Sequence, residues 1–173
     1  MPGGGITPAV ATDTLRIDDL RPGDWERVSK IFAEGIATGD STFETEVPSW
    51  ETWDADHLPG LRLVARNGER VVGWAAASRV SVRDVYRGVA EVSVYVSEEA
   101  RGRSAGEALL RALIDAADAE GVWTLEAIVI VENEASARMV EACGFRLVGR
   151  RERLGCLRDR WRDVLLYERR RPD

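Results

Sequence analysis

Hydrophobic positions along the chain follow two different periods, and the pattern predicts a mixed α/β protein. Short runs rich in β-branched and aromatic residues begin near positions 15, 61, 70, 89, 123, 145 and 162, as is typical of strands. Apolar positions spaced three and four residues apart predict helices that begin near positions 25, 50, 106 and 133. The expected order is strand, two helices, three strands, helix, strand, helix and two strands, in one sheet with helices on both faces.

Turn and cap residues set the expected boundaries of these elements. Asp24 is expected to cap the first helix, and Ser49 the second, which the Pro59-Gly60 dipeptide should end. Asn67-Gly68, between two apolar runs, predicts a β-hairpin.

The two later helices each have an expected buried face. For the helix after Gly106 this face is Ala108, Leu109, Ala112, Leu113 and Ala116, with Gly121 as its end. For the helix after Asn133 it is Ala135, Met139, Val140 and Cys143, with Gly144 as its end.

The segment EVSVYVSEEARGRSAG, at residues 91–106, is the most informative part of the chain. It predicts a strand that runs through a turn of small residues directly into a helix. Such a turn leaves backbone N–H groups at the helix N-terminus free to bind an anion. We therefore expect the chain to bind a cofactor that carries phosphate groups.

Composition bounds the function further. At 173 residues the chain is expected to form one domain, over residues 15–170, after a flexible tail at residues 1–14. A net charge of −6 argues against a general nucleic-acid binder, and no apolar run is long enough to span a membrane. No secretory signal is recognisable at residues 1–14, so a cytoplasmic location is expected.

Cysteine and histidine are too scarce for several kinds of site. Two cysteines, Cys143 and Cys156, exclude a disulfide framework, and with the single histidine, His57, they argue against a metal site or a Ser-His-Asp triad. No metal is expected.

Against this background, the loop RGRSAG at residues 101–106 resembles the R/Q-x-x-G-x-G/A loop of the GNAT superfamily of N-acetyltransferases. The segments STFETEVPSWETW, VRDVYRGVAEVSVYV and NEASARMVEACGF are similar to its phosphinothricin and methionine sulfoximine N-acetyltransferase branch, and the resemblance covers about residues 15–167. It implies a mixed, mostly antiparallel sheet with helices on both faces, acetyl-CoA as co-substrate, and a homodimer.

The resemblance also implies site residues. Glu91 matches the catalytic glutamate, a general base for the acceptor amine; the alternative is a glutamate on a solvated strand face. Main-chain groups freed by a bulge in the same strand would bind the thioester oxygen and the pantetheine arm. The implied cofactor-binding residues are Val94, Tyr95, Val96, Arg101, Gly102, Arg103, Ser104, Ala105, Gly106, Asn133 and Ser136.

Two positions depart from the family pattern. Ser104 replaces the first glycine of the loop, so a Cβ stands where the family has none. Val140 stands where the family often has a Tyr or His that protonates the leaving thiolate, and valine cannot donate a proton.

The acceptor is a small amino-acid-like amine on this resemblance. Arg83 and Arg87 are candidates for binding its anionic group, although both could equally be exposed loop residues. Phe43 and Trp161 are candidate walls of the acceptor pocket. The function expected is direct transfer of acetyl from acetyl-CoA to that amine. The alternatives are another acceptor (an antibiotic, a polyamine or a protein N-terminus) and a non-catalytic CoA-binding sensor.

Overall fold

One seven-stranded sheet organises the chain. The structure is a computed structural model that describes residues 14–172, so the tail expected at residues 1–14 lies, except for its last residue, outside the described part. The strands follow the order β1-β2-β3-β4-β5-β7-β6. All neighbouring strands are antiparallel except β4 and β5, which are parallel.

The elements follow the predicted order. The strands are β1 (Leu15–Asp19), β2 (His57–Asn67), β3 (Arg70–Arg79), β4 (Val89–Val96), β5 (Thr124–Ile130), β6 (Arg146–Leu157) and β7 (Arg160–Arg170). The α-helices are α1 (Trp25–Thr38), α2 (Trp50–Asp56), α3 (Ala105–Ala119) and α4 (Glu134–Ala142). Short 3₁₀ turns lie at Pro22–Asp24, Asp84–Tyr86 and Glu98–Ala100. The predicted hairpin at Asn67-Gly68 is confirmed, since it joins β2 to β3.

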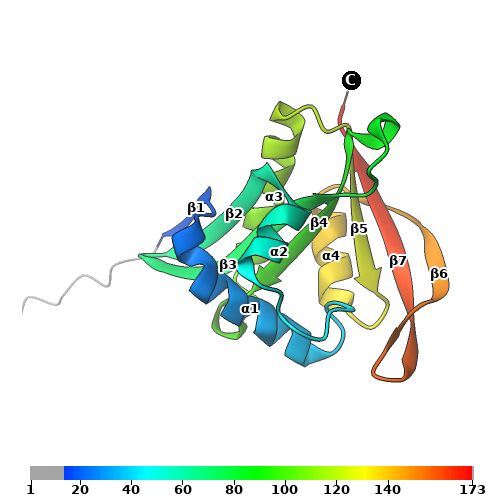
Figure 1. The fold of residues 1–173 in the computed structure, drawn as a ribbon, viewed down its shortest axis with the longest axis horizontal. Coiled ribbons are helices and arrows are strands. Elements are labelled where there is room, and N and C mark those ends of the chain that lie inside the picture. The colour runs from blue at the N-terminus through cyan, green and yellow to red at the C-terminus, as the bar shows by residue number, and fades with distance from the viewer. Residues whose placement is uncertain (1–13, 173) are drawn as a thin grey trace, which may run out of the picture.

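Helices cover both faces of the sheet, as expected (Figure 1). On one face α1 and α2 bury Phe32 and Trp53 against Trp74 of β3. On the other face α3 and α4 bury Leu109 and Val140 with the apolar side chains of β4 and β5. No helix within residues 14–172 combines the length and apolar character that crossing a membrane requires.

One predicted cap is confirmed in position only, and one predicted boundary is wrong. Asp24 stands at the N-cap position of α1, but its side chain makes no capping hydrogen bond. Its carboxylate instead accepts hydrogen bonds from the Arg21 N–H at 3.0 Å and from Arg66 at 2.9 Å. Pro59-Gly60 does not end α2, which stops at Asp56; the dipeptide lies within β2, where the register with β3 shifts. Proline donates no hydrogen bond to a sheet, so such an irregular stretch accommodates it.

The buried faces of α3 and α4 also differ from those predicted. Ala105, Leu109, Leu110, Leu113, Ile114 and Ala117 are the buried side chains of α3, whereas Ala108, Ala112 and Ala116 are half-buried. The helix packs across several strands, which shifts its buried face around the axis. On α4, Ala135 is exposed and Met139 half-buried, because both line a cavity instead of the core.

The parallel strands β4 and β5 diverge soon after they meet. They pair at three positions only, the last of which joins Glu91 to Glu126. Beyond that point β5 pairs with β7 alone, while β4 continues to Val96 along β3. The two strands therefore leave a gap between them within an otherwise continuous sheet (Figure 1).

Candidate active site

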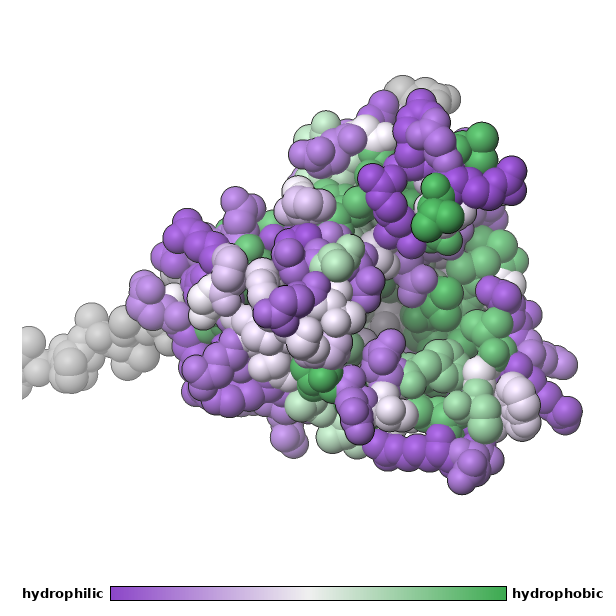
Figure 2. Space-filling model, viewed as in Figure 1, coloured by the Kyte–Doolittle hydropathy of each residue, from purple (hydrophilic) through white to green (hydrophobic). Residues whose placement is uncertain are grey.

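A cavity of about 920 Å³ occupies the gap between β4 and β5. Its size falls within the range of small-molecule sites. One side of the cavity, here called the helix side, consists of residues 100–107 and α4; the other, the loop side, consists of residues 38–44, Tyr95 and Leu154. Figure 2 shows a hollow on this face of the molecule, with apolar side chains beside it.

The N-terminus of α3 forms one end of the helix side. Gly102 and Ser104 both have left-handed backbone conformations, with φ of 74° and 62°, and this turn directs the chain into the helix. The side chain of Ser104, the N-cap residue, makes no capping hydrogen bond to the first N–H groups of α3. These groups, together with the positive end of the helix dipole, are suited to bind a phosphate.

Gly106 is also closely packed. A Cβ at this position would lie 2.9 Å from the sulfur of Met139 on α4, so a larger residue would require the Met139 side chain to move. Two guanidinium groups line this side, those of Arg101 and Arg138. Sequence reasoning missed Arg138, although its spacing of three residues from Ala135 and four from Ala142 places it on the helix face that lines the cavity. Arg103 does not line the cavity and is exposed.

The main chain of β4 faces the gap. The N–H of Ser97 donates to the Val72 carbonyl on β3 at 2.8 Å. Main-chain groups alternate in direction along a strand, so those of Val94 and Val96 point away from β3, toward β5. The register with β3 shows no irregularity, and the predicted bulge is therefore absent. Divergence of β4 from β5, instead of an extra residue, leaves the two amides and the Val94 carbonyl without a strand partner. The Val96 carbonyl accepts a hydrogen bond from the Arg101 side chain at 3.4 Å.

Tyr95 contributes to the cavity in another way. By the same alternation its main-chain groups face β3, and its ring stacks on Trp74 with centroids 4.7 Å apart. Burial, above all, raises the pKa of Tyr95 to about 12, and its hydroxyl makes a hydrogen bond with the Thr42 side chain. Tyr95 therefore supports the loop side as a neutral phenol.

Asn133 and Ser136 lie where α4 meets the cavity. The Asn133 side-chain oxygen accepts a hydrogen bond from the Ser136 N–H at 3.1 Å, which caps the helix. Its amide nitrogen makes no hydrogen bond within the described residues and can donate into the cavity. Val140 also lines the cavity and is 2% exposed. Its side chain is aliphatic, so this position offers no proton donor.

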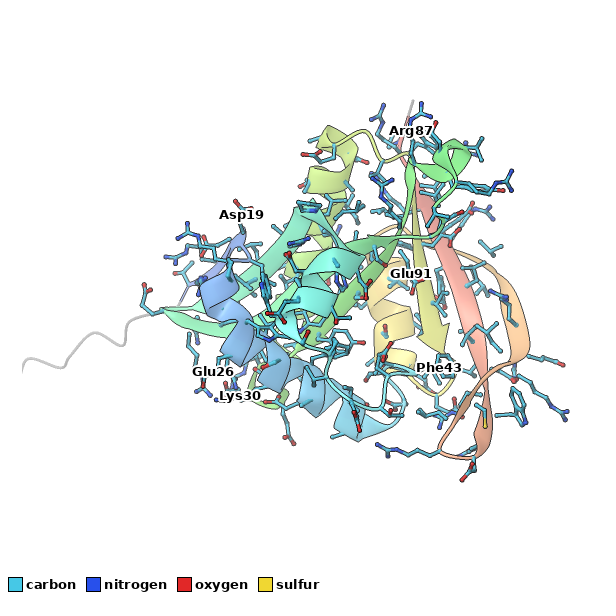
Figure 3. The ribbon with its side chains drawn as sticks, in the orientation of Figure 1. Asp19, Glu26, Lys30, Phe43, Arg87 and Glu91 are labelled. Carbon is cyan, nitrogen blue, oxygen red and sulfur yellow. The ribbon has the colours of Figure 1, made fainter. Side chains whose placement is uncertain are left out.

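Glu91 lies at the point where β4 and β5 separate (Figure 3). Its half-buried side chain lines the cavity and has no hydrogen bond or ion pair with the described residues. Burial, and secondarily the negative charge of Glu126, raise the pKa of Glu91. A carboxylate with a raised pKa and access to a cavity can take a proton from a bound group.

Phe43 is placed on the loop side by contact with the β6–β7 hairpin. A Cβ on Gly155 would lie 2.5 Å from the Phe43 ring, so the ring rests against bare backbone there. The neighbouring residues Thr42 and Glu44 line the cavity as well, and so does Leu154. Sequence analysis missed these three, although Thr42 and Glu44 flank Phe43 in one loop.

Three predicted acceptor residues are not brought to the cavity. Arg83 lies over the Tyr86 ring, at 5.5 Å, and Arg87 pairs with Asp84 at 3.3 Å. Figure 3 shows Arg87 beyond Glu91 from Phe43, at the far end of β4. Trp161 is 60% exposed on the β6–β7 hairpin.

Comparison with known proteins agrees with this architecture. The model of the acetyltransferase (GNAT) family matches residues 25–145. The phosphinothricin N-acetyltransferase of Alcaligenes faecalis is 32% identical to the chain, over 95% of this chain and 86% of its own length. That of Streptomyces coelicolor is also 32% identical, over 87% of this chain and 94% of its own length.

A solved structure is similar over nearly the whole chain. The phosphinothricin acetyltransferase of Sinorhizobium meliloti, in complex with AcCoA, has a TM-score of 0.80 and 29% identity, covering 91% of this chain and 88% of its own. The fold, the gap between β4 and β5 and these relatives agree on one assignment. The chain belongs to the GNAT family and is an N-acetyltransferase.

Proposed function

We propose that this enzyme transfers acetyl directly from acetyl-CoA to the primary amine of a small amino-acid-like acceptor, with Glu91 as general base. The observation that carries the proposal is the position of Glu91. It is a half-buried carboxylate with no hydrogen bond or ion pair among the described residues, at the head of a gap whose other end is the α3 N-terminus. The named activities of the relatives support the acceptor class.

The helix side fits acetyl-CoA. The N–H groups of α3, with Arg101, would hold its pyrophosphate. The main-chain groups of Val94 and the amide of Val96 would bind its pantetheine amides. Acetyl-CoA supplies an activated thioester. The thiol it releases has an ordinary thiol pKa, near 8.5, so its thiolate can leave without an acid from Val140.

Glu91 supplies the step that the acceptor needs. An ammonium group cannot attack a carbonyl, and Glu91 is placed to remove its proton, directly or through one water. Transfer is direct in this proposal because neither cysteine lines the cavity. Cys143 is also buried, and burial raises the pKa of its thiol, so it is a poor nucleophile.

The charge of the loop side favours a second candidate acceptor. Asp40 and Glu44 line the cavity there, and Glu91 lies at its head, whereas the lining arginines among the described residues, Arg101 and Arg138, are both on the helix side. Such a surface attracts a second positive charge better than a carboxylate. A polyamine or another polycationic amine is therefore the alternative acceptor, and Arg83 or Arg87 would bind an acid only if a second copy of the chain placed them at this site.

A homodimer and a cytoplasmic location complete the proposal. Exposed apolar side chains on the outer strands, among them Leu147, Val148 and Trp161, support an interface there. Sedimentation of the purified chain tests the dimer.

The decisive experiment is a thiol-release assay with acetyl-CoA and a panel of amines. The panel pairs phosphinothricin and methionine sulfone with their amides, and adds polyamines. Preference for the acids supports the amino-acid acceptor; preference for polyamines supports the alternative; no release with any amine, despite acetyl-CoA binding, would identify a non-catalytic sensor.

The same assay tests the base. Glu91→Gln should lower turnover about 10²–10⁴-fold, and less at high pH, where free amine is abundant. Glu132→Gln, at an exposed glutamate outside the cavity lining, is the control and should leave turnover unchanged. Undiminished turnover of Glu91→Gln at neutral pH would remove Glu91 from the mechanism.

A further inference from the structure

Three glutamates lie side by side across the sheet at the head of the cavity. Glu91 of β4 pairs in register with Glu126 of β5, and Glu126 pairs with Glu168 of β7. Register partners in a sheet point to the same face, and neighbouring strands lie about 4.8 Å apart. Glu91 and Glu126 form the last pair before β4 and β5 diverge.

The charges of these three residues are not equally compensated. Glu168 forms an ion pair with Arg146 of β6, its other register partner. Glu91 and Glu126 have no ion pair or hydrogen bond with the described residues, and both are half-buried. Like charges directly opposite each other in a sheet are unfavourable. No metal-binding group is present among residues 14–172 that could relieve the repulsion.

We propose that Glu126 is a positioning residue for acetyl transfer, which acts on the acceptor through Glu91 as the second member of a carboxylate pair. The inference rests on the proposed role of Glu91. A pair of carboxylates this close binds one proton more readily than either would alone. Glu126 thereby makes Glu91 a stronger base and then receives the proton that Glu91 has accepted.

The proton balance is simple. The acceptor ammonium gives a proton to the Glu91 carboxylate, which leaves a neutral amine and a carboxylic acid. That acid passes the proton to the Glu126 carboxylate, from which it leaves to water. Glu91 is again ionised, and no electron or further reactant is needed.

The other groups around Glu91 do not supply this effect. On β3 its register partner is the uncharged Ser78, which in turn faces His57 of β2. Burial lowers the pKa of His57, so this ring is neutral at pH 7. Tyr95 also lies near Glu91, Glu44 of the loop lines the same cavity, and Glu168 of the next strand is paired with Arg146. Glu126 is therefore the uncompensated charge closest to Glu91 in register.

The test compares pH profiles of kcat/KM for wild type, Glu126→Gln and Glu168→Gln. Removing the Glu126 charge should move the acid limb by roughly one unit to lower pH, since Glu91 then ionises more easily. The plateau should fall several-fold, since Glu91 becomes a weaker base. Glu168→Gln is the matched control: its charge is compensated by Arg146, so its acid limb should move less.

A second measurement needs no turnover. Carboxyl carbon NMR of the protein without acetyl-CoA should show the Glu91 titration at lower pH in Glu126→Gln than in wild type. Equal Glu91 titrations and superimposable acid limbs would overturn the pair, even if Glu126→Gln were less stable. Failure of the proposed function is distinct, because Glu91→Gln would then be as active as wild type.

Discussion

Ser104 has a backbone conformation that favours glycine, and Ser104→Gly should therefore stabilise the protein. Its φ of 62° and ψ of 7° lie in the left-handed region. Its side chain makes no capping hydrogen bond to α3, and the residue is exposed, so the substitution removes no buried contact. The hydrogen bond from the Ala108 N–H to the Ser104 carbonyl involves only main chain and would be kept.

The magnitude follows from two opposing terms. A residue with a Cβ loses about 1–2 kcal/mol in the left-handed conformation. Glycine cancels part of this gain, because its greater conformational freedom favours the unfolded chain by about 0.5–1 kcal/mol. The free energy of unfolding should therefore rise by about 0.5–1 kcal/mol. For a domain of this size that corresponds to a rise in Tm of about 1–4 °C.

Thermal and denaturant unfolding measure this change, and Arg103→Gly is the matched control. Arg103 is exposed in the same turn and is not among the residues with positive φ. Glycine there gains nothing in the folded state and should lower the free energy of unfolding by about 0.4–1 kcal/mol. Calorimetry should show acetyl-CoA affinity equal or somewhat tighter in Ser104→Gly. A lower Tm for Ser104→Gly, or equal shifts for both variants, would refute the conformational argument.

Two further predictions concern the two sides of the cavity. Gly106→Asp should weaken acetyl-CoA binding by at least about tenfold, since it adds a negative charge at the α3 N-terminus and bulk against Met139. Calorimetry measures the affinity, with Glu120→Asp at the other end of α3 as the control. Unchanged affinity in Gly106→Asp would place the phosphates elsewhere. Gly155→Ala should displace the Phe43 ring, because the added Cβ would lie 2.5 Å from it. The acceptor KM should then rise several-fold while the acetyl-CoA KM stays constant. Equal changes in both KM values would show that Phe43 does not act on the acceptor alone.

Local sequence was sufficient to predict the strand, turn and helix around residues 91–119. The strand β4, its turn and helix α3 are consecutive, and their apolar period, small residues and glycines determine the conformation without distant contacts. Asn133 illustrates the same point, since its cap on Ser136 depends on residues three apart. The order of the elements was predicted for this reason too.

Residues that depend on distant contacts were not predictable in the same way. Arg83 and Arg87 precede β4 in sequence, but neither lines the cavity: Arg83 lies over Tyr86, and Arg87 pairs with Asp84 across a short 3₁₀ turn. The buried face of α3 depends on which strands it crosses, and apolar spacing alone cannot specify that. Divergence of β4 and β5 replaces the predicted bulge, and it is visible only once both strands are placed.

The acidic groups around Glu91 have the same non-local origin, and they explain why a paired base would be useful. Glu44 and Glu91 line the cavity, and Glu126 is the register partner of Glu91 on β5. The three come from a loop and two strands far apart in sequence, so no single motif contains them. Carboxylates near a bound amine stabilise its ammonium form and thus raise the pKa of the acceptor. The charge that attracts the acceptor therefore also opposes the deprotonation that transfer requires. A second carboxylate beside Glu91 offsets this opposition, because it raises the proton affinity of the base together with that of the amine.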